Sequence, residues 1–151
     1  MRRLLKFLNL AAAQKRALLR AALVLAGIRC GLVFFRFLML RKFFYKIRPV
    51  IGPPAEKLDE TSIRRMVWAV ETASRCLPGA DNCLMRALAL KNLLGREEGV
   101  GLRVGVAKAE DGQLRAHAWI ERRKEILTGG QGCRAYAPLL NSFMNEMKEP
   151  R

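Results

Sequence analysis

Apolar residues at helical spacing dominate the first third of the chain. Over residues 3–20, leucines and alanines recur every third or fourth position without a proline or glycine, which predicts a helix. Residues 21–46 continue the pattern with more Leu and Phe, and two glycines in this stretch are candidate bends. Because Arg16 and Arg29 would fall on nearly opposite sides of one straight helix, the pattern favours two helices with different faces.

Prolines and a glycine gathered at positions 49–54 interrupt this pattern. We therefore expect a linker at residues 51–58. It would separate a basic, Leu/Phe-rich helical region at 1–50 from a core at 59–151.

The core begins with two further amphipathic segments. The first starts at the polar stretch 59–62, carries an apolar face at helical spacing and ends at Pro78. The second runs from about 82 to 94, with Asp81 as the expected N-cap and Gly95 as the stop. Both segments have the length and punctuation of ordinary globular helices.

The apolar period then changes from that of a helix to that of a strand. Alternation over 102–106 and 114–121, with Asp111-Gly112 between them, predicts a β-hairpin. A third short strand is expected at 125–128, and a final helix is expected from Pro138 onward. Helices followed by a small antiparallel sheet define an α+β fold.

The net charge of +15 is concentrated in the first third. Residues 1–55 hold twelve basic residues and no acidic one, whereas residues 56–151 hold sixteen basic and thirteen acidic residues. This asymmetry predicts an anionic partner or an anionic membrane surface for the first third. A membrane span is not expected, because it needs about 20 apolar residues and the uncharged run from Ala21 to Ile28 has eight.

Compartment and metal chemistry follow from a few residues. Lys6 interrupts the stretch that would imitate a signal peptide, so we expect a cytoplasmic protein with reduced cysteines. The four cysteines, at positions 30, 76, 83 and 133, form no CxxC pair, and the chain has one histidine. Neither a thiolate zinc site nor a His-rich metal site is expected, and no cofactor is implied.

Cys83 and His117 are the residues that suggest catalysis. Cys83 falls at the first turn of a predicted helix, where the amide dipoles and free N–H groups favour a thiolate. His117 lies in a predicted strand, on the face opposite Ala116 and Ala118. A thiolate on a helix facing an imidazole on a strand would support acyl transfer, with the histidine taking and returning a proton.

From spacing alone, simpler interpretations stay open. A cysteine on an apolar helix often acts as a small hydrophobic residue, and a lone histidine in a strand is often structural. Cys30, Cys76 and Cys133 are weaker candidates for the nucleophile, since none of them falls at a predicted helix start.

The sequence resembles the B2 proteins of lasso peptide biosynthesis, leader peptidases related to the microcin J25-processing protein. The resemblance lies in the stretches Cys83–Leu90, Leu93–Leu94, Val104–Val106 and His117–Glu121, and in the Leu/Arg-rich helices that end at Arg48-Pro49. It implies a transglutaminase-like or papain-like cysteine protease core, in which a helix-borne cysteine packs on a small antiparallel sheet preceded by basic N-terminal helices. It also implies cleavage of a precursor peptide between its leader and its core.

The family's cysteine matches Cys83 and its histidine matches His117. Its third catalytic member is usually an acidic residue about a dozen positions after the histidine, and Thr128 and Gly129 occupy those positions here. Thr128, through its hydroxyl or its backbone, is the first candidate to orient the imidazole. Glu121, on the same strand face as His117, is the runner-up, although a solvated surface role fits it equally well.

Trp119 and Arg86 are candidate substrate-binding residues. Trp119 shares the His117 face, where it would shield the imidazole, line the substrate groove or simply cover the sheet. Arg86 follows Cys83 by one helical turn, and it either adds positive potential at the site or pairs with a carboxylate, of which pairing is favoured. The loop at 129–132 lacks a phosphate-binding pattern, so no nucleotide site is expected there.

The resemblance also implies partners. In this family a small separate domain commonly captures the leader as an added β-strand, and about fifty helical residues before the linker leave no room for one. We therefore expect a stand-alone peptidase that acts with a leader-recognition protein on the precursor peptide, before an ATP-dependent macrocyclase closes the core. The apolar faces of the basic helices are expected to pack on the catalytic core, and their charges to dock a partner or an anionic membrane face.

Two other classes of function remain as alternatives. The same thiolate could serve an acyl transferase of the transglutaminase type, in which an amine rather than water accepts the acyl group. A non-catalytic basic protein that binds membrane or nucleic acid is the second alternative. Nucleic acid is disfavoured because the basic residues show little interleaving with aromatic residues of the kind that stack on bases.

Overall fold

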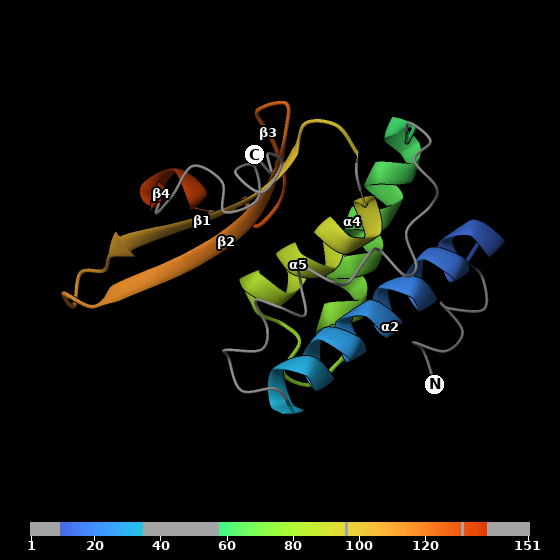
Figure 1. The fold of residues 1–151 in the computed structure, drawn as a ribbon, viewed down its shortest axis with the longest axis horizontal. Helices are drawn as coiled ribbons and strands as arrows, with labels where there is room; N and C mark the ends of the chain where they lie inside the picture. Colours follow the sequence, from blue (N-terminus) through green and yellow to red (C-terminus); the bar gives the residue numbers. More distant parts are fainter. Residues whose placement is uncertain (1–9, 35–57, 96, 131, 139–151) are drawn as a thin grey trace, which may run out of the picture.

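The computed structural model describes residues 10–34, 58–95, 97–130 and 132–138, and it has the α+β fold that the sequence predicts (Figure 1). Helices come first along the chain, and an antiparallel sheet with strand order β3-β2-β1-β4 follows. The elements are α2 (Ala12–Phe34), α4 (Glu60–Cys76), α5 (Cys83–Leu94), β1 (Val100–Lys108), β2 (Leu114–Arg122), β3 (Glu125–Thr128), the 3-10 helix η1 (Cys133–Ala135) and β4 (Ala137–Pro138).

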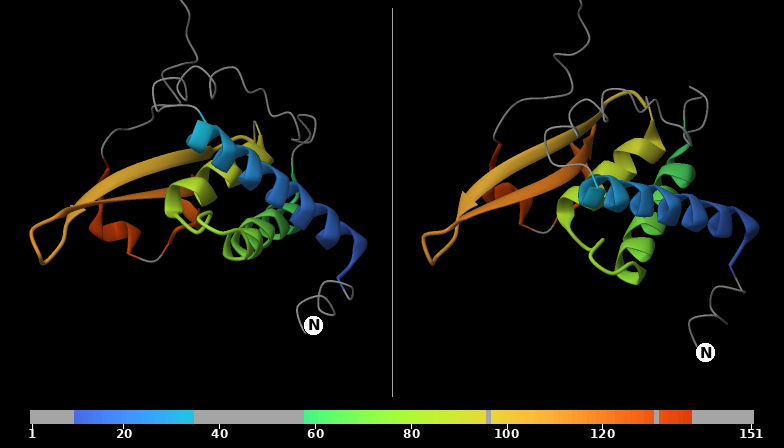
Figure 2. Two further views of the ribbon diagram at one scale, coloured as in Figure 1. Left: turned by 90° about the horizontal axis from the view of Figure 1, so that it is seen from below. Right: turned by 60° about the horizontal axis from the view of Figure 1, so that its bottom comes forward.

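Helix α5 lies at the centre of the packing. It contacts α2, α4, β1 and β2, so it joins the helical layer to the sheet (Figures 1 and 2). Leu90 and Leu94 of α5 are fully buried, as is Ile120 of β2. Burying side chains of this size stabilises the fold by roughly 1.5–3 kcal/mol each, so the position of α5 against the sheet is firmly fixed.

Helix α2 is a single continuous helix from residue 12 to residue 34, whereas the sequence pattern favoured two helices with different faces. Ala21, Val24 and Leu25 are buried in the same core as α4 and α5. Gly27 lies on the exposed side of the helix, and glycine lowers helix stability without requiring a bend. One buried stripe therefore packs the whole of α2 on the core, and Arg16, Arg20 and Arg29 lie outside this stripe.

Within the described residues, no helix combines the length and apolar character that a transmembrane span needs. The expected helical residues 3–9 and 35–46, and nearly all of the linker at 51–58, lie outside the described residues.

The boundaries of α4 and α5 follow the sequence signals with one difference. Helix α4 begins within the predicted stretch 59–62, with Asp59 as its N-cap, but the N-cap of α5 is Asn82 rather than Asp81. The Asn82 side-chain oxygen accepts a hydrogen bond from the backbone N–H of Met85 at 2.7 Å. A capping side chain must directly precede the first helical residue to reach this N–H. Asp81 lies one residue too early, and α5 ends at Gly95 as expected.

The three predicted strands are confirmed. Strands β1 and β2 pair in an antiparallel hairpin, and Gly112 in its turn has a φ of 80°. The β2–β3 turn uses Arg123 and Lys124, both at positive φ. A final helix was expected from Pro138. Pro138 instead belongs to strand β4 (Ala137–Pro138), which pairs with β1, and residues 139–151 lie outside the described part.

A cluster of ion pairs, which we call the Arg122 cluster, connects the helices to the far end of the sheet. Arg122 at the end of β2 donates to Glu60 at 3.0 Å and to Glu97 at 3.1 Å. The other carboxylate oxygen of Glu97 accepts a hydrogen bond from the backbone N–H of Leu58 at 3.1 Å. The Leu58 N–H is the main reason that the pKa of Glu97 lies below its ordinary value, and Arg122 lowers it further.

We expect Glu97→Gln to lower the free energy of unfolding by about 1–3 kcal/mol near neutral pH, because it weakens hydrogen bonds to a charged acceptor. Since the folded-state pKa of Glu97 is depressed, its contribution is present above the unfolded-state value of 4.5 and is lost as the pH falls through the lower folded-state value. The difference between Glu97→Gln and wild type should therefore shrink in acid. Urea unfolding of both proteins near neutral pH and again in acid measures this difference. The exposed Glu98→Gln is the control. Equal losses in both variants would contradict this role.

Candidate active site

Cys83 is the first residue of α5, as the sequence predicts. Its side chain is half-buried and packs against the core, so its position is fixed by the helix. Helix geometry leaves the backbone N–H groups of Cys83 and Leu84 without acceptors inside the helix. Backbone N–H groups of this kind, at the positive end of the helix dipole, can hold an oxyanion.

The second candidate residue, His117, lies in β2 opposite Gly105 of β1. Its Nε2 atom lies 2.7 Å from the backbone oxygen of Gly129, which follows β3. A carbonyl oxygen can only accept a hydrogen bond, so Nε2 must carry the proton that it donates. In the neutral ring the other nitrogen, Nδ1, is therefore the one with a free lone pair. The imidazole is thus set up as a base that acts through Nδ1.

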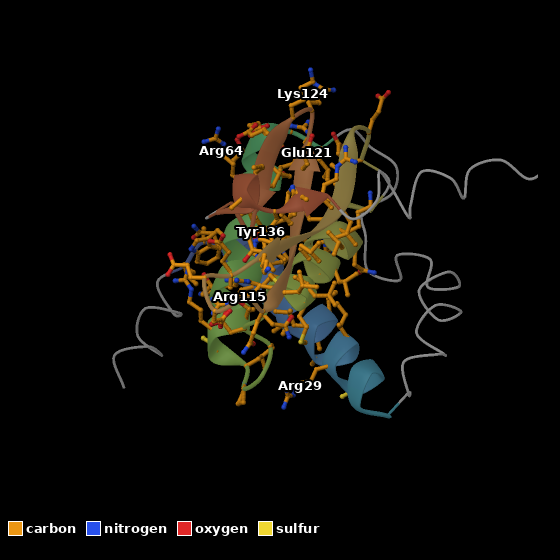
Figure 3. All side chains as sticks on the ribbon, turned by 90° about the vertical axis from the view of Figure 1, so that its left-hand side faces the viewer. Arg29, Arg64, Arg115, Glu121, Lys124 and Tyr136 are labelled. Carbon is orange, nitrogen blue, oxygen red and sulfur yellow. The ribbon has the colours of Figure 1, made fainter. Side chains whose placement is uncertain are left out.

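Aromatic rings hold the imidazole in place. Trp119, two residues further along β2, stacks with the His117 ring at a centroid distance of 6.1 Å, and Tyr136 lies at 5.1 Å in a tilted arrangement. Trp119 is 7% exposed, so it shields the imidazole rather than presenting a broad surface to a substrate. Tyr136, which the sequence did not single out, comes from the segment between η1 and β4 (Figure 3).

Two glycines make this packing possible. A Cβ atom on Gly105 would lie 2.9 Å from Tyr136 Cβ and 3.1 Å from the Trp119 ring. A Cβ atom on Gly129 would lie 2.9 Å from the Ala118 carbonyl oxygen and 3.2 Å from His117 Nε2. Gly129 also has a φ of 77°, a conformation that costs other residues energy. The sequence motifs contained Gly105 and Gly129, but the sequence alone did not predict their close packing against Tyr136, Trp119 and His117.

The two side chains predicted as third catalytic member lie elsewhere. Thr128 pairs with Ile120 across the sheet and is 4% exposed, so its side chain shares the buried face with Ile120. Glu121 accepts from Arg103 Nε at 3.3 Å and lies toward the Lys124 turn, away from Tyr136 (Figure 3). The group that orients His117 is instead the backbone carbonyl of the residue after Thr128.

Arg86 makes the ion pair that the sequence favoured. Its Nη1 atom lies 3.4 Å from Asp81 Oδ1, on the loop that enters α5. The pair braces this loop against the first turn of the helix, directly beside Cys83. Its role in substrate binding stays a prediction.

Helix α5, which begins at Cys83, contacts β2, which carries His117. Ala118 and Ile120 of β2 belong to the core shared with α5, and because side chains alternate along a strand, His117 lies on the other face of the sheet. Within the described residues, no hydrogen bond joins the Cys83 thiol to the His117 ring, and the pairing of these two residues stays a prediction. Cys30 and Cys76 are exposed and Cys133 is buried in η1, and none of the three begins an α-helix.

A half-buried cysteine at the start of a helix and a histidine on an antiparallel sheet that packs against that helix are residue types that acyl-transfer enzymes use. The model of the transglutaminase-like superfamily matches residues 22–141, and the chain belongs to this superfamily. The matched range begins within α2, which agrees with the packing of α2 into the common core. No curated protein and no solved structure matches the chain.

We expect Gly129→Ala to lower the free energy of unfolding by about 1–3 kcal/mol, because it adds strain at positive φ, and to break the bond to His117 Nε2. Gly130→Ala is the matched control, since its Cβ would meet only Ile126 Cγ2, at 3.5 Å. Nitrogen-15 NMR of the imidazole reports the tautomer without ambiguity, because His117 is the only histidine in the chain. If both variants keep the Nε2–H tautomer with equal stability, the orienting role of Gly129 is wrong.

Proposed function

We propose that this protein is a cysteine peptidase with Cys83 as nucleophile, His117 as general base and acid, and the Gly129 carbonyl as the group that orients the imidazole. The observation that carries the proposal is the 2.7 Å contact between His117 Nε2 and the Gly129 oxygen. It fixes the tautomer in which Nδ1 is free to take a thiol proton. The position of Cys83 at the start of α5 supports its activation as a thiolate.

The proposed reaction follows from these positions. His117 Nδ1 takes the proton from Cys83 Sγ, and the thiolate attacks the carbonyl carbon of the scissile peptide bond. The backbone N–H groups at the start of α5 stabilise the oxyanion. The imidazolium gives its proton to the leaving amine as the C–N bond breaks, which leaves a thioester. Water, deprotonated by His117, then hydrolyses the thioester and restores the thiol.

The proposed substrate is the precursor of a lasso peptide, cleaved between leader and core. The resemblance of Cys83–Leu90 and His117–Glu121 to the lasso B2 leader peptidases supports this choice, and membership in the transglutaminase-like superfamily agrees with it. We propose that a stand-alone leader-recognition protein brings the precursor, and that an ATP-dependent macrocyclase then closes the released core. This order places the reaction in the cytoplasm, where ATP is available to the cyclase.

We expect Cys83→Ala to abolish cleavage and His117→Ala to lower its rate by about 10⁴ or more, because nucleophile and base act as a unit. Mass spectrometry of a cognate precursor incubated with its leader-binding partner and this protein measures this. A leader fragment and a core fragment should appear with wild type and not with Cys83→Ala.

Cys30→Ala and Cys76→Ala are the matched controls. Both thiols are exposed, so these substitutions should leave cleavage intact. Loss of cleavage in Cys133→Ala with retention in Cys83→Ala would show that the nucleophile is misassigned. Product that forms only when an amine is added, and carries that amine, would identify an acyl transferase instead.

A further inference from the structure

A concave site lies between α2 and the beginning of α4, away from Cys83 and His117. It is a pocket of about 240 Å³ that no step of the proposed reaction uses. Leu93, in the last turn of α5, forms part of its wall, whereas Cys83 begins the same helix. Leu93 follows Cys83 by ten positions, so this part of the pocket wall lies about 15 Å from Cys83 along α5.

Three arginines give this pocket its charge. Arg16 and Arg20 come from successive turns of α2, and Arg65 comes from α4. No carboxylate is among the lining residues, and the apolar part of the wall includes Leu58, Met66 and Leu93. Three cations around one concave site leave a positive potential that an anionic ligand can satisfy.

The nearby carboxylates are largely engaged elsewhere. Glu60 accepts from Arg64 at 3.1 Å and from Arg122 at 3.0 Å. Asp59, the N-cap of α4, is not among the lining residues, and its carboxylate attracts Arg65. Within the part of the chain that the structure describes, neither Arg16 nor Arg20 forms an ion pair with a carboxylate.

Exposed apolar side chains lie beside the arginines. Leu19 and Leu23 are 61% and 54% exposed. Together with Arg16 and Arg20 they follow a spacing of three and four residues, so all four share one face of α2. We call this face the Arg16–Leu23 face. Exposed leucines next to unpaired arginines are suited to a partner that is itself apolar and acidic.

We propose that the three-arginine pocket and the Arg16–Leu23 face bind an acidic amphipathic helix of a partner protein. A glutamate of that helix enters the pocket, and its apolar residues cover Leu19 and Leu23. The concave shape favours a protein side chain over a membrane, because the pocket has room for a single inserted group with an apolar stem against Leu58, Met66 and Leu93. Bidentate pairing of a guanidinium with a carboxylate supplies the specificity.

The test is fluorescence anisotropy of the full chain with a labelled synthetic helix that presents glutamates and leucines on one face. Arg65→Gln, and separately the double substitution Arg16→Gln and Arg20→Gln, should weaken binding by about tenfold or more. Arg64→Gln is the matched control, because Arg64 precedes Arg65 on α4 and is exposed but does not line the pocket (Figure 3). It should leave affinity nearly unchanged, and thermal melts of each variant confirm folding.

Several outcomes would overturn the proposal. If a peptide in which glutamines replace the glutamates binds equally well, the pocket does not recognise carboxylates. Equal losses in Arg64→Gln and Arg65→Gln would mean that only the overall charge attracts the peptide. Phosphatidylglycerol vesicles that bind with Arg65 dependence while the peptide does not would identify lipid phosphate as the ligand. Cys83→Ala should bind like wild type, so this test stands or fails independently of the peptidase.

Discussion

The hydrogen bond from His117 Nε2 to the Gly129 carbonyl is the interaction on which the candidate active site depends. It decides which imidazole nitrogen holds the proton and which can act as a base. The backbone rather than a side chain provides the acceptor, so the site depends on the path of the chain after β3. Gly129 can take that path because it tolerates positive φ and has no Cβ to strike the Ala118 carbonyl.

A neutral acceptor has consequences for the charge balance of the site. A carboxylate in this position would stabilise the imidazolium by direct attraction, whereas a carbonyl offers only its dipole. In the proposed mechanism, stabilisation of the thiolate–imidazolium pair would then rest more on the thiolate side. There, the backbone N–H groups of Cys83 and Leu84 at the start of α5 have no acceptor inside the helix. Asn82 caps the helix with a neutral side chain.

Much of the fold could be predicted because it rests on local patterns. The apolar period predicts α4, α5 and the three strands, and the cap and stop residues place Cys83 at a helix start. The α2 prediction failed because arginines on opposite sides suggested two faces, although long exposed side chains can leave a helix on either side of one buried stripe. Sequence reasoning could not find the Gly129 carbonyl, because a backbone acceptor has no residue-type signature. The predicted residue, Thr128, directly precedes Gly129, but its buried side chain lies on the face of Ile120 rather than on the face of His117.

Helix α5 also defines the relation between the two proposed sites. Cys83 lies at its first turn and Leu93 lines the arginine pocket at its last turn. A coupling between sites requires an element with two arrangements. Buried leucines fix α5 between the other helices and the sheet, and close-packed interiors of this kind resist displacement. The helix therefore acts as a rigid spacer. A partner held at the arginine pocket would set the distance at which a bound peptide is presented to Cys83, without altering the thiol itself.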